Sequence, residues 1–312
     1  MGSQHKRHEG LKTFRRTAAK PKIEKKQAPV ELTPLQQAHR TLSQELLNAL
    51  ATLVAPQLED METFTAQLQQ IKQHFFKRNY ELVFQNSELC DVYAARYLPS
   101  RALAYADLFH STKPVLDLLY PPPRAMRPSE RRLQPAVQKR EPVRITAVGA
   151  GVGSELCALQ LLPRLRLAEL DVDVDEDLIE VLDRDIEMDV IDNAAYAPFL
   201  STLETSMADA FPPPKAKLGQ CTLRYHQEDI LQYGTTDAFA AMLSETTLLT
   251  FMFVFNELFA ASRVDAMKLI EAIAKNLPAG AHVLLIESAG DLSEVQVADG
   301  TMMAGQGLEV PT

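Results

Sequence analysis

Three alternate glycines in the middle of the chain are spaced to bind a nucleotide-type cofactor. Gly149, Gly151 and Gly153 follow an apolar, strand-like run that begins at Val143. Glycine adopts φ values that other residues resist, and it lets the backbone pass close to a ligand. A helical pattern follows the glycines, and the start of a helix offers free N–H groups to a polar ligand. The pattern therefore predicts a strand, a cofactor loop and a helix in direct succession.

The glycine spacing distinguishes two kinds of cofactor loop. A dinucleotide loop has the pattern G-x-G-x-x-G/A, whereas Ser154 holds the sixth position in this chain. The observed G-x-G-x-G spacing, with Ala150 between the first two glycines, instead suits a loop for S-adenosylmethionine (SAM). No recognisable hydride-transfer constellation accompanies the loop, so the sequence favours SAM over NAD.

Acidic residues follow two later strand-like runs, where the crevice of a parallel sheet would lie. Asp192 ends the run from Ile186 to Ile191 and is the candidate acceptor for a ribose diol. Asp229 comes shortly after the run from Leu223 to His226 and is the candidate acceptor for an adenine amino group. Ile230 would pack against the adenine ring.

A fourth strand carries the candidate catalytic residues at its end. The run from Leu248 to Phe255 is almost continuously apolar, as a strand covered on both faces requires. Asn256 and Glu257 follow it and would face the crevice. A helical pattern and a fifth strand, His282 to Ile286, come next. The order βαβαβαβαβ predicts an α/β fold, a parallel sheet with helices on both faces.

Four segments together resemble the fungal large-subunit (25S) rRNA uridine-N3 methyltransferases. They are Arg96 to Tyr105, Gly149 to Glu155, His226 to Leu231 and Phe255 to Leu258. The similarity extends over about residues 60 to 290. It implies a Rossmann-like, SAM-dependent enzyme that methylates N3 of a uridine in large-subunit rRNA. It also implies that SAM is held by Gly149, Gly151, Gly153, Asp192 and Asp229.

The chain departs from that wider fold in two places. Many relatives carry an acidic residue two positions before the first glycine, where this chain has Ala147. A complete sheet of this type has two more strands after the fifth, but only 25 residues follow Glu287. We therefore expect the last strands to be missing and the fifth strand to be an exposed edge.

Methylation at uridine N3 requires loss of the N3 proton, which calls for a base or for donors that stabilise the resulting anion. Glu257 is the candidate base, and Asn256 is the candidate donor to a uracil carbonyl. The same pair could instead cap the following helix or contact the methionine part of SAM.

Basic and aromatic residues upstream of the glycine loop are candidates for binding the substrate. Lys77, Arg78, Arg96 and Arg101 are interspersed with Phe76, Tyr80, Tyr93, Tyr97 and Tyr105. Such a mixture can stack an extruded base and hold its phosphates, or it can be an ordinary helical surface. Arg96 and Arg101 are the stronger candidates, because they lie in the family-like segment.

The region before the sheet is predicted to be helical. A helix start is predicted by Thr33, Pro34 and Gln36, and apolar residues then recur at helical spacing. A second such pattern runs from Met61 to Phe75, so the two helices could pack face to face. We expect four parts: a disordered basic tail (1–32), a helical domain (33–120), a Pro/Arg-rich linker (121–142) and the SAM-binding domain (143–312).

The charge distribution bears on partners. The net charge is −9, yet the first 26 residues hold nine Lys or Arg against two Glu. This tail suits RNA phosphates or nuclear import, although a solvated flexible terminus explains it equally. The linker arginines likewise suit phosphate contacts or an extended charged linker. The partner expected from the resemblance is rRNA or a pre-ribosomal particle.

Other features exclude several classes of protein. No run reaches the roughly 18 apolar residues of a membrane span, and no signal peptide is visible. Three cysteines without paired spacing favour a reducing compartment, and we expect the nucleus or nucleolus and the cytoplasm. No metal site is expected: the acidic run Asp171 to Asp177 lacks the turn glycine and final Glu of a calcium loop, and the histidines lack zinc spacing. A methyltransferase of proteins or small molecules and a non-catalytic scaffold remain the alternatives.

Overall fold

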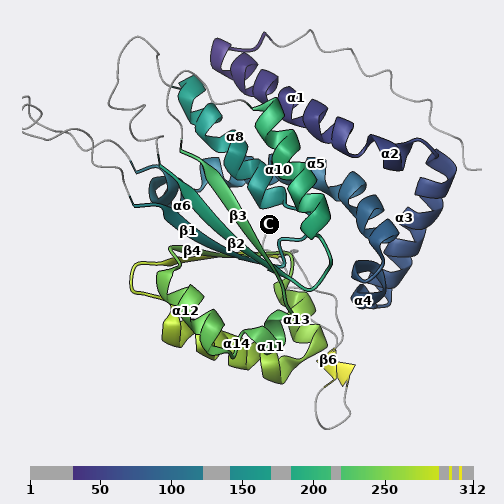
Figure 1. The fold of residues 1–312 in the computed structure, drawn as a ribbon, viewed down its shortest axis with the longest axis vertical. Helices are drawn as coiled ribbons and strands as arrows, with labels where there is room; N and C mark the ends of the chain where they lie inside the picture. Colours follow the sequence, from purple (N-terminus) through teal and green to yellow (C-terminus); the bar gives the residue numbers. More distant parts are fainter. Residues whose placement is uncertain are drawn as a thin grey trace, which may run out of the picture.

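A five-stranded parallel sheet forms the centre of the molecule (Figure 1). The computed structural model describes residues 31–121, 141–169, 184–211 and 219–287, and two short strands beyond them. The strand order is β3-β2-β1-β4-β5. The strands are β1 (Val143–Val148), β2 (Ile186–Asp192), β3 (Cys221–Gln227), β4 (Leu248–Met252) and β5 (His282–Ile286). The predicted α/β fold is confirmed.

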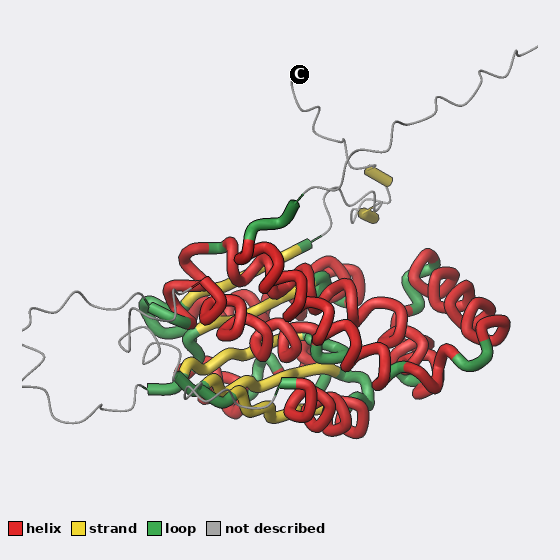
Figure 2. The backbone as a smooth tube through the Cα atoms, turned by 90° about the horizontal axis from the view of Figure 1, so that it is seen from above, coloured by secondary structure: helices red, strands yellow, loops and turns green. Residues whose placement is uncertain are grey.

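Helices cover both faces of the sheet, as the crossovers between parallel strands require. Helices α8 (Ser154–Glu169) and α10 (Ala197–Ala210) lie on one face. The opposite face carries α11 (Ile230–Tyr233), α12 (Asp237–Glu245), α13 (Phe255–Ala261) and α14 (Arg263–Asn276). Figure 2 shows the strands running between these layers. The sheet is thereby buried at its centre, with the side chains of β4 almost fully covered.

The N-terminal helices lie on the same side of the sheet as α8 and α10, and two of them pack directly on this layer. They are α1 (Pro34–Leu53), α2 (Ala55–Leu58), α3 (Met61–Phe76), α4 (Tyr80–Phe84), α5 (Ser87–Ser111) and α6 (Lys113–Leu119). The predicted start of α1 is confirmed: Thr33 and Gln36 exchange side-chain-to-backbone hydrogen bonds of 3.0 and 3.2 Å. A single apolar cluster joins these helices to the sheet.

The packing predicted between the first two long helices is wrong. Helix α1 packs mainly on α8 and α10, whereas α3 packs on α5. Helix α5 lies between them and buries Ala94, Leu98 and Ala102, whose small or slender side chains admit a close neighbour on either side. The apolar stripes of α1 and α3 are thus directed at different partners, which their spacing alone does not reveal.

Strand β4 is shorter than its apolar run predicts. The strand ends at Met252, because Phe253 adopts a left-handed backbone conformation (φ 63°) that a strand cannot contain. Helix α13 begins two residues later, at Phe255. Asn256 and Glu257 therefore lie in the first turn of a helix rather than at the end of a strand.

Strand β5 is the edge of the sheet within the described residues, as expected. It pairs with β4, and no described strand pairs with its other side. Val283 and Leu285 remain 51% and 43% exposed. The two short strands, β6 (Val295–Gln296) and β7 (Met302–Met303), form a separate antiparallel pair. No described helix is both long and apolar enough to cross a membrane.

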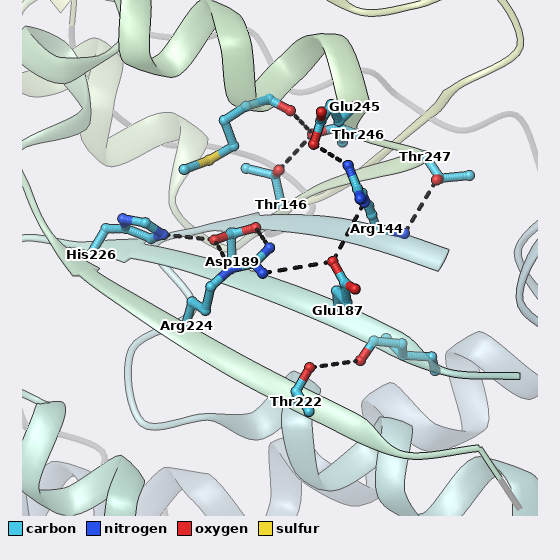
Figure 3. A network of polar contacts seen from close by, with 12 residues as sticks. Arg144, Thr146, Glu187, Asp189, Thr222, Arg224, His226, Glu245, Thr246 and Thr247 are labelled. Carbon is cyan, nitrogen blue, oxygen red and sulfur yellow. Dashed lines mark hydrogen bonds and ion pairs between the residues drawn. The ribbon is translucent and has the colours of Figure 1, made fainter. Parts of the chain in front are cut away.

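The outer face of β2 and β3 carries a polar network in place of an apolar layer (Figure 3). Arg224 donates two hydrogen bonds to the Asp189 carboxylate, at 2.9 and 2.7 Å. His226 contacts the same carboxylate at 2.7 Å through Nε2. Arg144 on β1 pairs with Glu187 and with Glu245 at the end of α12. The network lets this face meet water while the buried Asp189 keeps its partners.

Asp189→Ala is expected to lower the free energy of unfolding by about 1–3 kcal/mol, because it removes a buried acceptor shared by two donors. Burial opposes ionisation, but hydrogen bonds from Arg224 and His226 outweigh it and lower the pKa of Asp189. This contribution to stability is therefore present above the ordinary Asp pKa and is lost as pH falls through the lowered value. Urea unfolding at pH 7 and at about pH 3 measures both effects.

The matched control is Glu245→Ala, which removes an exposed ion pair of the same network and should cost under about 1 kcal/mol. The predicted role of Asp189 would be contradicted if both variants lowered the free energy of unfolding equally. It would also be contradicted if the loss in Asp189→Ala did not become smaller at low pH.

Candidate functional site

A cavity of about 550 Å³ opens at the carboxyl ends of β1 to β4. The sheet side of its wall comes from the loops that follow these four strands, which is where ligands bind in parallel α/β sheets. The facing wall comes from the N-terminal helices. The wall includes Arg78 to Leu82, Tyr93, Arg101, Gly149, Gly151, Asp192, Asn193, Glu228 to Leu231, Phe253 and Glu257.

The glycine loop brings bare backbone to the cavity. Gly149 and Gly151 line it, with φ values of 66° and 55° that favour glycine. A Cβ atom on Gly149 would lie 2.5 Å from Val254 Cγ2, so Val254, two residues after the end of β4, can lie against the loop only because no side chain intervenes. The loop thus offers its main chain to a ligand.

Gly153 and Ala150 belong to the glycine loop but do not line the cavity. A Cβ atom on Gly153 would lie 2.7 Å from Leu203 Cδ2 and 2.8 Å from Leu200 Cδ2, both on α10. Gly153 therefore permits close packing of α10, and its N–H donates to the Ala150 carbonyl at 3.2 Å. The sequence predicted that both residues bind the cofactor. In the structure, Gly153 makes room for α10 and Ala150 accepts its hydrogen bond.

Asp192, at the end of β2, fastens the glycine loop and lines the cavity. Its Oδ2 atom accepts from the Gly151 N–H, and its Oδ1 atom accepts from the Ala194 N–H, each at 2.9 Å. Burial raises the pKa of Asp192, and these N–H donors oppose the rise. Each carboxylate oxygen retains a lone pair, so the group is able to accept further bonds from a diol.

Asp229 and Ile230 line the cavity beyond the end of β3. Asp229 is the N-cap of α11: Oδ1 accepts from the Leu231 N–H at 3.0 Å, and Oδ2 accepts from Gln232 Nε2 at 3.2 Å. The Ile230 side chain is buried beside it. A carboxylate next to an apolar side chain is the arrangement predicted for an adenine site.

Arg101, one of the two arginines of α5, lines the opposite end of the cavity. Its Nη1 atom donates to the Tyr93 hydroxyl at 2.5 Å. The guanidinium carbon also lies 5.3–5.7 Å from the ring centres of Tyr93, Tyr97 and Phe253. These aromatic contacts hold the cation in one place through cation–π attraction.

Glu257 lies on the same end of the cavity, on α13. Burial raises the pKa of its carboxyl to about 7, the Arg101 charge opposes the rise, and the Glu287 and Asp192 carboxylates add to it. The Glu257 side chain forms no hydrogen bond or ion pair with any residue that the structure describes. A carboxylate with a pKa near neutrality and no partner is suited to general-base chemistry.

Carboxylates outnumber cations around this end of the cavity. Glu155 on α8 is 2% exposed, its Oε1 atom has no hydrogen-bond partner, and burial raises its pKa to about 7. The charge of Arg101 interacts with both Glu155 and Glu257. Ala147, at the position where many relatives have an acid, is fully buried in β1. The local excess of acid favours a cationic ligand.

Two predicted residues lie outside the cavity wall. The backbone N–H of Asn256 donates to Glu287 Oε2 at 2.8 Å, and the Asn256 side chain does not line the cavity. Arg96 is exposed on α5, with its guanidinium carbon 5.3 Å from the centre of the Tyr97 ring. Their proposed roles remain predictions.

The sequence missed one part of the cavity wall and the buried Glu155 carboxylate, which does not itself line the cavity. Residues 78–82, the turn into α4, carry no motif and come from a segment far from the glycine loop. Glu155 follows that loop by two residues, so its place in the first turn of α8 was a usable signal.

Several expectations lie outside the described residues. These are the basic tail, most of the Pro/Arg-rich linker and the acidic run from Asp171 to Asp177. Among the described residues, no group of three or more His, Cys, Asp or Glu side chains is placed to hold a metal ion.

Comparison with known proteins adds two findings. The family described as "Putative SAM-dependent methyltransferase" matches residues 51–303. The 25S rRNA (uridine(2843)-N(3))-methyltransferase of Saccharomyces cerevisiae is 23% identical over 240 residues. That alignment covers 75% of this chain and 60% of the yeast protein. The match with the family takes in the glycine loop, the five strands and most of the N-terminal helices.

Proposed function

Because this chain belongs to a family of SAM-dependent methyltransferases, we propose that it methylates N3 of a uridine in large-subunit ribosomal RNA, with SAM bound in the cavity. The similarity to the yeast 25S rRNA methyltransferase supports the substrate. The observation that carries the proposal is Glu257, a carboxyl group without a partner among the described residues, whose pKa of about 7 suits removal of the N3 proton.

The residues around the cavity fit SAM. A volume of about 550 Å³ lies within the usual range of roughly 300–1,000 Å³ for small-molecule sites. Gly149 and Gly151 leave room for the ligand, Asp192 would accept from the ribose diol, and Asp229 with Ile230 would take the adenine. SAM carries a sulfonium and an ammonium group, so the acidic surroundings of Glu155 and Glu257 complement its charge.

The side chains at the other end of the cavity support the proton transfer and the orientation of the base. When bound, SAM supplies a methyl group activated by its sulfonium centre. Glu257 would accept the N3 proton, which frees the nitrogen lone pair to form the new N–C bond as the methyl–sulfur bond breaks and S-adenosylhomocysteine leaves. Arg101 would stabilise the negative charge that spreads to the uracil oxygens, and Tyr93 holds Arg101 in place. Alignment of the two reactants supplies much of the remaining rate enhancement.

The reaction itself provides the test. The purified chain is incubated with large-subunit rRNA and SAM carrying an isotopically labelled methyl group, and digested nucleosides are analysed by mass spectrometry. We expect label in 3-methyluridine. Label in protein or a small molecule, or SAM binding without transfer to any RNA, would replace this proposal with one of the other methyltransferase or scaffold functions.

Substrate and location are linked in this proposal. An enzyme acting on large-subunit rRNA would meet it in pre-ribosomal particles, so we propose the nucleus or nucleolus and the cytoplasm as its sites of action. The basic N-terminal residues support contact with RNA phosphates by their charge.

Asp229→Ala is expected to weaken SAM binding by about tenfold or more, since a hydrogen bond to a charged group contributes about 1.5–3 kcal/mol. The variant also removes the cap of α11. Asp229→Ser separates the two effects: serine is a good N-cap but is too short to replace the carboxylate at the ligand. Calorimetric titration of SAM measures both.

Asp237→Ala, on the exposed first turn of α12, is the control and should bind SAM as the wild type does. If Asp229→Ser retained full affinity, Asp229 would act only as a helix cap.

A further inference from the structure

The turn between α3 and α4 forms one rim of the cavity, although it belongs to the N-terminal helices. Residues 78–82 line the same cavity as Asn193, Glu228 and Asp229. Figure 1 shows α3 and α4 beyond the carboxyl ends of the strands, apart from the helices that cover the sheet. A substrate in the cavity would therefore lie close to this turn.

Phe76 is directed away from the protein at this rim. Helix α3 buries Phe64, Leu68 and Ile71, and Phe75 packs against the rings of Tyr80, Phe84 and Tyr93. Phe76, the last residue of the helix, is 90% exposed and forms no ring contact with a described residue. A single exposed aromatic residue is common on protein surfaces, so its surroundings decide its meaning.

The surroundings of Phe76 are basic in an acidic protein. Lys72, Lys77 and Arg78 lie within four residues of it, all three are exposed, and no Asp or Glu occurs from residue 63 to residue 80. The chain as a whole has a net charge of −9. Cations next to an exposed aromatic ring are the combination that binds single-stranded nucleic acid, through phosphate contacts and base stacking.

The backbone of the turn positions Arg78 at a cost. Arg78 adopts a left-handed conformation (φ 58°), at a helix end where glycine is the usual residue. Its N–H donates to the Phe75 carbonyl at 3.0 Å, and the Asn79 N–H donates to the His74 carbonyl at 2.9 Å. A long cation kept at such a position, on the wall of the cavity, points to a use for its side chain.

We propose that Phe76, Lys77 and Arg78, here called the rim turn, bind single-stranded RNA next to the target uridine. Phe76 stacks on a neighbouring base, and Lys77 and Arg78 contact the adjoining phosphates. The inference rests on the proposed RNA substrate. A uridine that enters the cavity leaves the stack of its own strand, and a ring at the rim offers its neighbour a replacement partner.

The test compares binding of labelled oligouridine to the full chain by fluorescence anisotropy, in the presence of SAM. Phe76→Ala should raise the Kd for oligouridine about tenfold. The Kd for SAM should stay unchanged, because so exposed a ring supports neither the fold nor the cavity. Phe76→Trp should restore binding. Lys77→Ala should weaken binding and reduce its dependence on salt concentration by about one phosphate contact.

The matched control is Met61→Ala, which removes a 57% exposed apolar side chain at the other end of α3. The proposed role of the rim turn would be overturned if Phe76→Ala kept the wild-type affinity for oligouridine, or if Phe76→Ala and Met61→Ala lost affinity equally. It would also be overturned if the wild type did not bind oligouridine. The proposed function fails separately, if the wild type transfers no methyl group to rRNA.

Discussion

Glu257→Gln should lower the rate of methyl transfer to rRNA by about 10²- to 10⁴-fold, the usual contribution of a general base. Glutamine keeps the size of the side chain but cannot accept the N3 proton. Because the carboxyl group lacks a partner among the described residues, its replacement should leave the fold nearly intact. The lost negative charge should weaken SAM binding only modestly, so the loss of rate should persist at saturating SAM. Single-turnover rates, with the enzyme in excess over rRNA and SAM saturating, measure the chemical step.

The pH dependence of the wild-type rate provides a second test of Glu257 as the general base. Burial, aided by the Glu287 and Asp192 carboxylates, raises the pKa of Glu257 to about 7 against the opposing charge of Arg101. The base works when ionised, so the rate should increase with pH below about 7 and level off above it. In Glu257→Gln this rise should be absent.

The control for Glu257 is Glu271→Gln, on the exposed surface of α14, which should have the wild-type rate and pH profile. A Glu257→Gln variant that loses SAM affinity and keeps its rate at saturating SAM would instead place Glu257 on the methionine part of the cofactor.

Asp192→Ala is expected to weaken SAM binding by 100-fold or more, which corresponds to about 2.7 kcal/mol or more. The substitution removes the candidate ribose acceptor, and it also releases the Gly151 and Ala194 N–H groups that position the loop. Two partly buried donors without acceptors should further lower the free energy of unfolding by about 1–3 kcal/mol each. Calorimetric titration and thermal unfolding without SAM measure the two losses.

Asp192→Asn retains one acceptor oxygen and should show an intermediate loss of SAM affinity. The control Asp209→Ala changes an exposed residue near the end of α10 and should have neither effect. An Asp192→Ala chain that binds SAM normally would show that the carboxylate acts on the loop alone.

The parts of this protein that follow from the sequence are those with local causes. The apolar runs of β1, β2 and β5 bound these strands to within a residue, because alternation with polar loops marks their ends. The capping box at Thr33 defines α1 for the same reason. Strand β4 was extended too far because nothing in the composition of Leu248 to Phe255 signals the left-handed Phe253.

The cavity likewise has one part that the sequence predicts and one part that it does not. Gly149, Gly151, Asp192 and Asp229 stand at strand ends, so the topology of the sheet brings them together. The facing wall depends on how α3, α4 and α5 pack, and that packing joins residues far apart in the chain. No local pattern predicts that residues 78–82 share a cavity with Asp229, or that the charge of Arg101 acts on Glu257.

The two edges of the sheet differ in a way that affects how copies of the protein meet. Beside β3, the polar network holds the partly exposed guanidinium of Arg224, and a strand from another molecule would have to remove water from this charge. Beside β5, the exposed side chains of Val283 and Leu285 present no such barrier. Among the described strands, β5 is therefore the edge at which we expect self-association, and a single lysine on this strand should protect the sheet at a distance from the cavity.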